Sequence, residues 1–281
     1  MTNIPVIKSA NWHFTAKCNY SCGFCTRQNS NGELSSLESV DAVLTSLQRL
    51  GIEKLNIVGG EPMMHPLFYE LLRLSKEMGF VACVTTNGSL LNAATIQKMQ
   101  GYVSWVGISI DSPSDETAAE MGRGKGHHLA HIKKIVPMLR EAGIKLKINT
   151  VVTKQTKDED MRDVIAELKP ARWKVFQFLT IKGQNDHVSD EFAVTAEEFE
   201  KYCERHRTVE LESEGKTIYP VFESAECMCD SYFMIDANGE VEVNTPDGVL
   251  HVPLNAVTLE NFSKLVDYEK YAERGAVYAW H

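Results

Sequence analysis

Three cysteines stand within eight residues, CNYSCGFC at positions 18–25, at the spacing C-x3-C-x2-C. A structural zinc site needs four protein ligands, but the motif offers three, and the nearest imidazole, His13, falls in a predicted strand. A disulfide is disfavoured because the cysteine count of seven is odd and we expect a reducing compartment. An iron–sulfur cluster held by Cys18, Cys22 and Cys25 would leave one iron open to a ligand from outside the protein. We favour this last interpretation.

Predicted helices and strands, which could position this motif, alternate along the chain up to residue 181. Helical spacing of apolar residues alternates with short apolar, β-branched runs, which predicts βα units and a parallel sheet, either open or closed into a barrel. Beyond residue 181 the alternation weakens to a helix and then a hairpin with a two-residue turn at Asn238–Gly239. We therefore expect a core at 1–181 and a less regular part at 182–281. The predicted helices are 36–51, 65–79, 92–102, 127–143, 158–170 and 195–206, and the predicted strands are 11–15, 54–60, 80–88, 103–111, 145–153 and 172–181.

Polar residues follow several predicted strands, as in GGEP at 59–62, TTNGS at 85–89 and SIDS at 109–112. Ligand sites of parallel α/β folds gather at the carboxyl ends of strands, so we expect the site at that edge. Lys147 and Asn149 alternate on one strand, Arg172 and Lys174 repeat the spacing on the next, and we place all four at the same edge. Alternate residues share a face of a strand, which predicts an anion site.

The net charge of the protein limits the kinds of molecule that it can bind. The net charge of −9 disfavours nucleic acid and anionic membranes, whose binding needs clustered Lys and Arg, but it allows a small anionic ligand. Hydrophobic residues make up 43% and charged residues 24% of the chain, values typical of soluble proteins. The first residues, MTNIPVIKSANWHF, lack the features of a secretory signal and of an amphipathic anchor. We expect a cytoplasmic protein without membrane attachment.

The cysteine spacing, with an aromatic residue before the last cysteine, resembles the signature of the radical S-adenosylmethionine (SAM) enzymes. The resemblance implies a partial (β/α)6 TIM-like barrel with an irregular C-terminal extension, one 4Fe–4S cluster, and SAM chelated to the open iron. It also implies that one electron, from a flavodoxin or ferredoxin type of donor, cleaves SAM to a 5′-deoxyadenosyl radical. Phe24 would shield the cluster. The other implied SAM contacts are Gly59, Gly60, Glu61, Thr86, Asn87, Ser109 and Arg123.

From about residue 9 to residue 280 the chain is similar to the viperin family, in its prokaryotic branch. The segments that carry this are NWHFTAKCNYSCGFC, EKLNIVGGEP, TTNGSLL, GRGKG, LKINTVV, RWKVFQFL and EEFEKYCERH. The resemblance implies an antiviral enzyme that abstracts the ribose 4′ hydrogen of a nucleoside triphosphate, expels the 3′ hydroxyl as water and releases the 3′-deoxy-3′,4′-didehydro analogue. Tyr232 would be the late hydrogen donor, although as a strand residue it could equally be a packed core aromatic. The implied substrate contacts are Asn11, Lys54, Lys147, Asn149, Arg172 and Lys174.

Two departures from the family pattern leave the base open, with CTP favoured and UTP or GTP as alternatives. Val58 stands where the animal enzyme has serine, and TPDGVLHVPLNA at 245–256 lacks a lysine-containing run. Residues 182–281 are expected to complete and cover the nucleotide site, in a monomer. One alternative is a GTP-cyclising enzyme of molybdenum-cofactor synthesis, which needs three C-terminal cysteines where this chain has only Cys227 and Cys229 close together. Another is a metal-binding regulatory module, which would leave the strand-end segments without a use.

Overall fold

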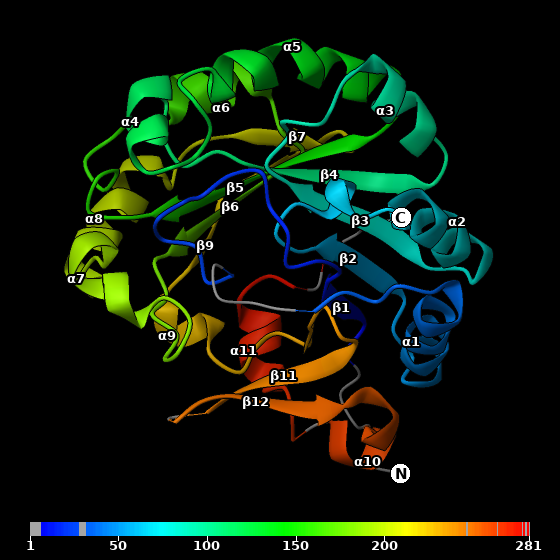
Figure 1. Ribbon diagram of the computed structural model, residues 1–281. Coiled ribbons are helices and arrows are strands. Elements are labelled where there is room, and N and C mark those ends of the chain that lie inside the picture. The colour runs from blue at the N-terminus through cyan, green and yellow to red at the C-terminus, as the bar shows by residue number, and fades with distance from the viewer. Residues whose placement is uncertain are drawn as a thin grey trace.

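Six parallel strands form the centre of the molecule (Figure 1). The computed structural model describes residues 7–27, 32–245, 247–262, 264–276, 278 and 280. The six strands lie side by side in chain order, which confirms the predicted partial barrel built from βα units. They are β1 (Ser9–His13), β2 (Lys54–Val58), β3 (Val81–Thr86), β4 (Val103–Ser109), β5 (Lys145–Val152) and β6 (Arg172–Gln177).

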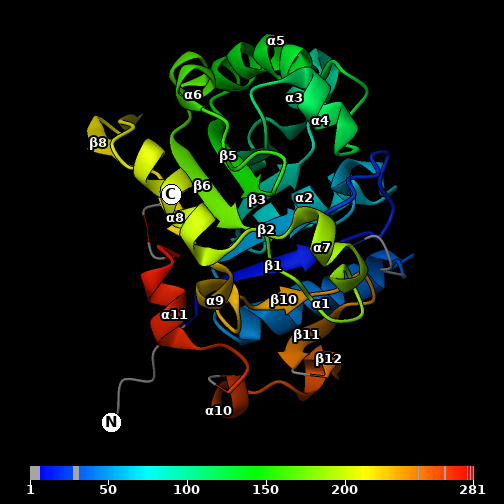
Figure 2. The same ribbon diagram turned by 90° about the vertical axis from the view of Figure 1, so that its left-hand side faces the viewer.

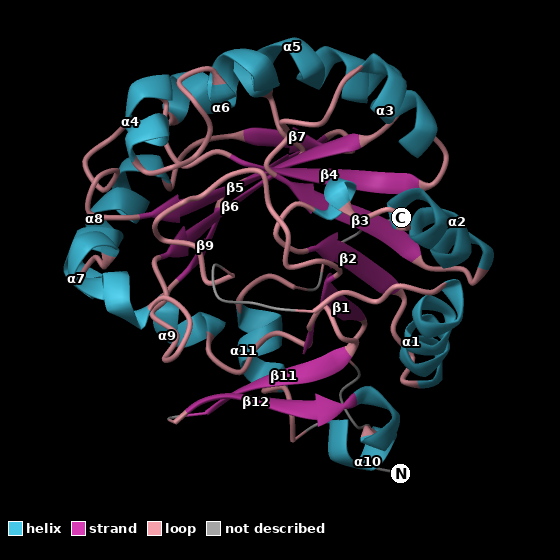
Figure 3. Ribbon diagram, in the orientation of Figure 1, coloured by secondary structure: helices cyan, strands magenta, loops and turns pink. Residues whose placement is uncertain are grey.

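Helices cover the outer, convex side of this sheet (Figure 3). The predicted helices are present with shorter ends, and one short helix that was not predicted, α4 (Asp115–Glu120), precedes α5. Side-chain caps fix several starts: the Ser36 hydroxyl accepts from the Ser39 amide, and Asn92 and Thr95 form a capping box. The predicted set comprises α1 (Leu37–Arg49), α2 (Phe68–Glu77), α3 (Ala93–Met99), α5 (His128–Glu141), α6 (Arg162–Leu168) and α8 (Ala196–His206).

Strict alternation along the strands gives the barrel an apolar outer face and a polar inner face. In β5, Leu146 and Ile148 are buried under the helices, whereas Lys147 and Asn149 line a cavity inside the sheet. Successive side chains of a strand point to opposite faces, so this pattern follows from the sequence alone. The same division separates the buried residues Leu55, Ile57, Val84, Val106, Ile108, Trp173 and Val175 from the cavity residues Lys54, Asn56, Thr85, Ser109, Lys174 and Phe176.

The irregular C-terminal part extends the same sheet at both ends, giving the strand order β12-β11-β10-β1-β2-β3-β4-β5-β6-β9. The predicted hairpin at 230–245 is present, but its two-residue turn is wrong. The Asp236 amide donates to the Glu240 carbonyl, so three residues form the loop, and Gly239 adopts a φ of +81°. The division of the chain at residue 181 stays a prediction. The added strands are β9 (Val221–Glu223), β10 (Met234–Ile235), β11 (Glu240–Thr245) and β12 (Gly248–Pro253), with β7 (Leu211–Ser213) and β8 (Lys216–Ile218) as a separate hairpin.

Short helices complete the chain, and α11 lies beside the open side of the barrel (Figure 2). Among the described residues, none of the helices is long and apolar enough to span a membrane. These short elements are η1 (Pro62–Met64), η2 (Asp186–Val188), α7 (Ser189–Phe192), α9 (Ala225–Met228), η3 (Leu254–Ala256), α10 (Leu259–Phe262) and α11 (Tyr268–Glu273).

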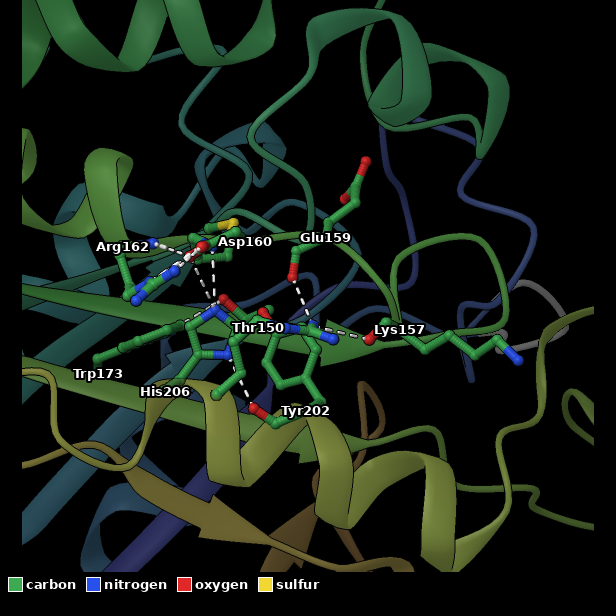
Figure 4. A network of polar contacts seen from close by, with 10 residues as sticks. Thr150, Lys157, Glu159, Asp160, Arg162, Trp173, Tyr202 and His206 are labelled. Carbon is green, nitrogen blue, oxygen red and sulfur yellow. Dashed lines mark hydrogen bonds and ion pairs between the residues drawn. The ribbon is translucent and has the colours of Figure 1, made fainter.

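On the outer face of β5 and β6, His206 of α8 bonds the segment before α6 and packs its ring 5.4 Å from that of Trp173 (Figure 4). The Nε2 atom of His206 accepts from the Met161 amide at 3.0 Å, and its Nδ1 donates to the Tyr202 carbonyl at 2.9 Å. Burial lowers the pKa of His206, in agreement with a neutral ring. The Trp173 indole donates to the Thr150 hydroxyl at 3.0 Å. Trp173 is thereby fixed on the outer face, and its neighbours Arg172 and Lys174 are held on the inner face.

Candidate active site

One cavity of about 430 Å³ runs inside the barrel. All three motif cysteines line it, together with most of the residues that we predicted to contact SAM or a nucleotide. Two predicted residues, Glu61 and Arg172, do not line it. The predicted residues on the wall are Asn11, Cys18, Cys22, Phe24, Cys25, Lys54, Gly59, Gly60, Thr86, Asn87, Ser109, Arg123, Lys147, Asn149, Lys174 and Tyr232.

The glycines of the GGEP segment seat the loop that carries the cysteines. The Gly60 amide donates to the Thr15 carbonyl and the Glu61 amide to the Lys17 carbonyl, both at 2.7 Å. A Cβ on Gly60 would lie 2.2 Å from the Lys17 carbonyl oxygen, and one on Gly59 would lie 2.6 Å from that of Thr15. Only glycine allows this close approach of two backbones, so the segment fixes the start of the cysteine loop.

Glu61 ties two strand ends together. Its fully buried carboxylate accepts from the Thr86 hydroxyl at 2.8 Å and from the amides of Asn87 and Met63 at 2.9 and 3.2 Å. These bonds compensate the burial of the charge. The side chain is therefore used within the protein, and Gly59 and Gly60 are the residues of this segment that reach the cavity.

The cysteine loop fits an iron–sulfur cluster better than a single metal ion. None of the seven cysteines, all of which lie in the described part of the chain, forms a disulfide. The Sγ atoms of Cys18, Cys22 and Cys25 do not all lie within 4.8 Å of one another, unlike the ligands of one zinc ion. The Tyr20 amide donates to Cys18 Sγ at 3.4 Å and the Arg27 amide to Cys25 Sγ at 3.3 Å. Such bonds stabilise cluster sulfurs. Burial raises the pKa of Cys22 to about 11, a cost that metal ligation would offset.

An apolar shell surrounds the buried side of this loop. Cys22 and Phe24 pack with Met121, Phe178 and Phe192, and the rings of Phe24 and Phe192 are 5.8 Å apart. This shell restricts water near the cysteines, as expected for the shielding role that the family resemblance implies for Phe24.

The predicted SAM contacts converge at the carboxyl ends of β3 and β4, next to the cysteine loop. The Asn87 amide group bonds Asn19 at 2.9 Å and reaches Cys18 Sγ at 3.8 Å. Arg123 forms a buried ion pair with Asp111, whose other oxygen accepts from the Val151 amide at 2.8 Å. Sequence analysis missed Asp111, although it lies within the SIDS segment. Because Asp111 engages only Nε of Arg123 among the described contacts, the guanidinium can still face a ligand.

Five buried cations, Lys54, Lys147, Arg172, Lys174 and Arg274, gather at the other end of the cavity; we refer to them as the cation group. Among the described residues, only Lys174 has a carboxylate partner, the fully buried Glu223. A Cβ on Gly107 would lie 2.8 Å from Cε of Lys147, so a glycine in β4 leaves space for this lysine. Burial lowers the pKa of Lys54 to about 8 and that of Lys174 to about 7.

Tyr278 forms part of the floor beneath the cation group. The Lys54 ammonium bonds its hydroxyl and lies 4.2 Å from its ring centre, while the Arg172 guanidinium lies 3.9 Å from the ring centre. Arg172 also donates to the Gly275 carbonyl. Arg172 therefore holds the tail of the chain in place from behind the cavity wall.

The cation group lies toward the amino ends of the strands, so the predicted place of Lys147, Arg172 and Lys174 at the carboxyl edge is wrong. Lys54 and Arg172 are the first residues of β2 and β6. This end can bind a ligand because the tail closes it with Arg274 and Tyr278. Sequence analysis missed Glu223, Arg274 and Tyr278, which belong to no local motif and join the site only through folding.

Asn11 and Tyr232 occupy the side of the cavity formed by β1 and the C-terminal part. The side-chain oxygen Oδ1 of Asn11 accepts from Nδ2 of Asn56 at 2.7 Å. The Tyr232 hydroxyl donates to Glu223, and the Arg274 guanidinium stacks 3.6 Å from the Tyr232 ring centre. Asn149 Oδ1 is buried without a hydrogen-bond partner among the described residues, so it is available to a ligand.

A parallel partial barrel with a three-cysteine loop at one strand end is the architecture of a radical SAM enzyme. The sequence model of the radical SAM superfamily matches residues 12–168. Solved structures agree at the level of the fold: the SAM-bound anSMEcpe–peptide complex superposes with a TM-score of 0.67 over 95% of this chain and 82% of that one, at 15% identity. SuiB from Streptococcus suis with bound SAM gives 0.62 over 95% and 67%, at 18% identity.

Comparison with curated proteins identifies the family of this chain within the superfamily. An S-adenosylmethionine-dependent nucleotide dehydratase of a Thermoplasmatales archaeon is 35% identical over 99% of this chain and 98% of its own length. A protein of the same name from Flammeovirga pacifica is 30% identical over 98% and 97%, and RSAD2 of Danio rerio is 34% identical over 81% and 65%. The chain belongs to the radical SAM superfamily and, within it, to the S-adenosylmethionine-dependent nucleotide dehydratase family. This confirms the resemblance found in the sequence.

Proposed function

We propose that this protein is a radical SAM enzyme that dehydrates a nucleoside triphosphate, with CTP favoured over UTP or GTP, to its 3′-deoxy-3′,4′-didehydro analogue. One observation carries the proposal: four members of the cation group, Lys54, Lys147, Lys174 and Arg274, line the same cavity as the cysteine loop. The proposed radical source and the proposed polyanion site thus face the same cavity.

The charge of the cation group matches a triphosphate. Five cations oppose one buried carboxylate, Glu223, and burying unpaired charges costs free energy that a bound polyanion offsets. Lysine and arginine also form strong, charge-assisted bonds to phosphate oxygens. Because the protein as a whole is acidic, this positive end is a local exception and not part of a general basic surface.

The residues of the cavity have separate roles in the proposed reaction. The cysteines would hold a 4Fe–4S cluster that, with SAM, supplies the 5′-deoxyadenosyl radical. Gly59, Gly60, Thr86, Asn87, Ser109 and Arg123 would hold SAM. The nucleotide, with its 4′ hydrogen toward the radical carbon, would be held by Asn11, Asn149, Lys54, Lys147, Lys174 and Arg274, and Arg172 would support this site from behind the cavity wall. Overall, a nucleoside triphosphate, SAM, two electrons and a proton give the didehydro nucleotide, 5′-deoxyadenosine, methionine and water.

Tyr232 is the proposed final hydrogen donor. It lines the cavity, and its hydroxyl is held by Glu223 while Arg274 covers its ring. An electron donor of the flavodoxin or ferredoxin type would approach the exposed Cys18. We also propose that the enzyme is monomeric and cytoplasmic and has an antiviral role.

Turnover with different nucleotides tests the function. The protein reconstituted with iron and sulfide, dithionite and SAM should form 5′-deoxyadenosine far faster with a nucleoside triphosphate than without one, and CTP should give the highest rate among CTP, UTP, GTP and ATP. Mass spectrometry of the nucleotide should show the loss of one water. Equal 5′-deoxyadenosine formation with and without every nucleotide would contradict the proposal. A Cys25→Ala variant controls for cleavage that does not depend on the cluster.

A further inference from the structure

A buried ion pair outside the cation group also lines the cavity. Arg27 Nη1 lies 2.6 Å from Glu242 Oε1, with 8% and 7% of the two side chains exposed. Arg27 comes from the cysteine loop and Glu242 from β11, so the pair joins the cluster region to the C-terminal strands. Nothing in the proposed radical chemistry or phosphate binding uses it.

The pair retains hydrogen-bonding capacity. Arg27 Nε is buried and has no hydrogen-bond partner among the described residues. The described bond uses one nitrogen and one oxygen, whereas an arginine–carboxylate pair can form two parallel bonds. A buried donor without a partner costs free energy, which a ligand group with an acceptor would recover.

Strand register places the pair at the far end of the substrate side from the phosphates. Glu242 pairs with Met234, Met234 with Asn11, and Asn11 with Asn56, which gives one row across four strands. All four side chains line the cavity. Lys54 lies on the same strand face as Asn56, so a nucleotide with its phosphates at Lys54 would extend along this row toward Glu242. The carboxylate itself would repel a phosphate.

We infer that Arg27 and Glu242 recognise the nucleobase of the substrate and select cytosine over uracil. This inference rests on the proposed function. A carboxylate accepts from the exocyclic amine of cytosine, while arginine donates to the adjacent ring nitrogen or O2; uracil would direct its O4 acceptor at the carboxylate. His13, beside Arg27 on the cavity wall, stays neutral because burial and the Arg27 charge lower its pKa, so it adds no competing charge.

Product ratios from mixed nucleotides test the inference. The reconstituted enzyme receives equal CTP, UTP, GTP and ATP, and each didehydro product is measured by mass spectrometry. Glu242→Gln offers an amide donor to uracil O4 and should shift the cytidine-to-uridine product ratio toward uridine by about fivefold or more. Arg27→Gln should lower the same ratio. Glu240→Gln, on the same strand but outside the cavity wall, should keep the wild-type ratio.

Because the Arg27–Glu242 pair also joins two parts of the structure, its loss could impair folding. Iron content and thermal melting of each variant therefore distinguish a change in base selectivity from a loss of folding. If Glu242→Gln folds poorly, the single variant Arg27→Lys, measured in the same way, carries the test. An unchanged ratio in folded, iron-loaded variants would overturn the inference. If the wild type turns over no nucleotide, the proposed function fails, and calorimetric Kd values for CTP and UTP then test the inference separately. Tighter binding of CTP than of UTP by the wild type, with a smaller difference in Glu242→Gln, supports the inference. Equal binding of CTP and UTP by the wild type, or an unchanged difference in Glu242→Gln, refutes it.

Discussion

Burial is the main influence on the pKa values of the lysines in the cavity. Lys54, Lys147 and Lys174 are all held inside the barrel, and burial lowers the pKa of each. Only Lys174 has a carboxylate partner among the described residues, and even there burial outweighs the opposing effect of Glu223. A triphosphate would restore the charged form of these lysines, because opposite charges stabilise each other more strongly away from water.

Nucleotide binding should therefore take up protons at mildly alkaline pH. The pKa is about 8 for Lys54 and about 7 for Lys174 in the free protein, below the ordinary lysine value, so both lose protons between pH 7 and 9. Binding needs the protonated forms, so the Kd for CTP should rise by about tenfold or more over this range.

Titration calorimetry in two buffers of different ionisation enthalpy at pH 8 measures the proton uptake directly. Lys54→Met should reduce it, whereas Lys133→Met, a substitution on the exposed surface, should not. A Kd independent of pH from 7 to 9, without proton uptake, would contradict this account.

At the scale of elements, two glycines decide which loops and side chains approach each other. Gly60 after β2 meets the backbone of the cysteine loop, and Gly107 within β4 leaves room for Lys147. Neither has a positive φ, so both are required for space and not for backbone conformation. They serve opposite ends of the same cavity.

Alanine at these positions should separate cluster binding from nucleotide binding. Gly60→Ala places a Cβ against the Lys17 carbonyl, a backbone atom that cannot easily move, so the reconstituted variant should lose most of its iron. Gly107→Ala contacts the flexible Lys147 side chain and should keep its iron but bind CTP about tenfold more weakly. Iron analysis and calorimetry check the two effects, and each variant is the control for the other. Equal iron loss in both would show that the effects come from general destabilisation.

At the scale of the whole molecule, the C-terminal part adds side chains to the wall of the cavity inside the barrel. Residues after 181 contribute Glu223, Tyr232, Arg274 and Tyr278 to the cation end, and Glu242 to the opposite side. Arg172 and the Gly275 carbonyl meet across 103 residues of chain. The substrate end of the cavity thus depends on contacts between distant segments.

Arg172 and Tyr278 should act as one unit in nucleotide binding. Arg172 is behind the cavity wall, so we expect it to work by holding Tyr278 and the tail. Arg172→Ala and Tyr278→Ala should each weaken CTP binding, and the double variant should be little worse than either single one, because residues in contact are not additive. Calorimetry on the four proteins measures the coupling. Fully additive losses would instead indicate that Arg172 binds phosphate directly. Lys8→Met, whose exposed side chain pairs with Glu53 and is not on the cavity wall, controls for a general loss of positive charge.

The sequence by itself determined the three-cysteine loop, the alternating elements and the polar inner face. Cys18, Cys22 and Cys25 are neighbours on one loop, and the strand pattern has a period of two, so both are local properties of the chain. Lys147 with Asn149, and Arg172 with Lys174, were found for the same reason.

Only the tertiary structure decided at which end of the barrel the cations lie and what completes their site. Strand register and the path of the tail bring Glu223, Arg274 and Tyr278 to Lys54 and Lys174, and they leave Glu61 and Arg172 outside the cavity wall. These positions depend on contacts between residues far apart in the chain, about which a local pattern carries no information. The pairing of Arg27 with Glu242, 215 residues apart, arises in the same way.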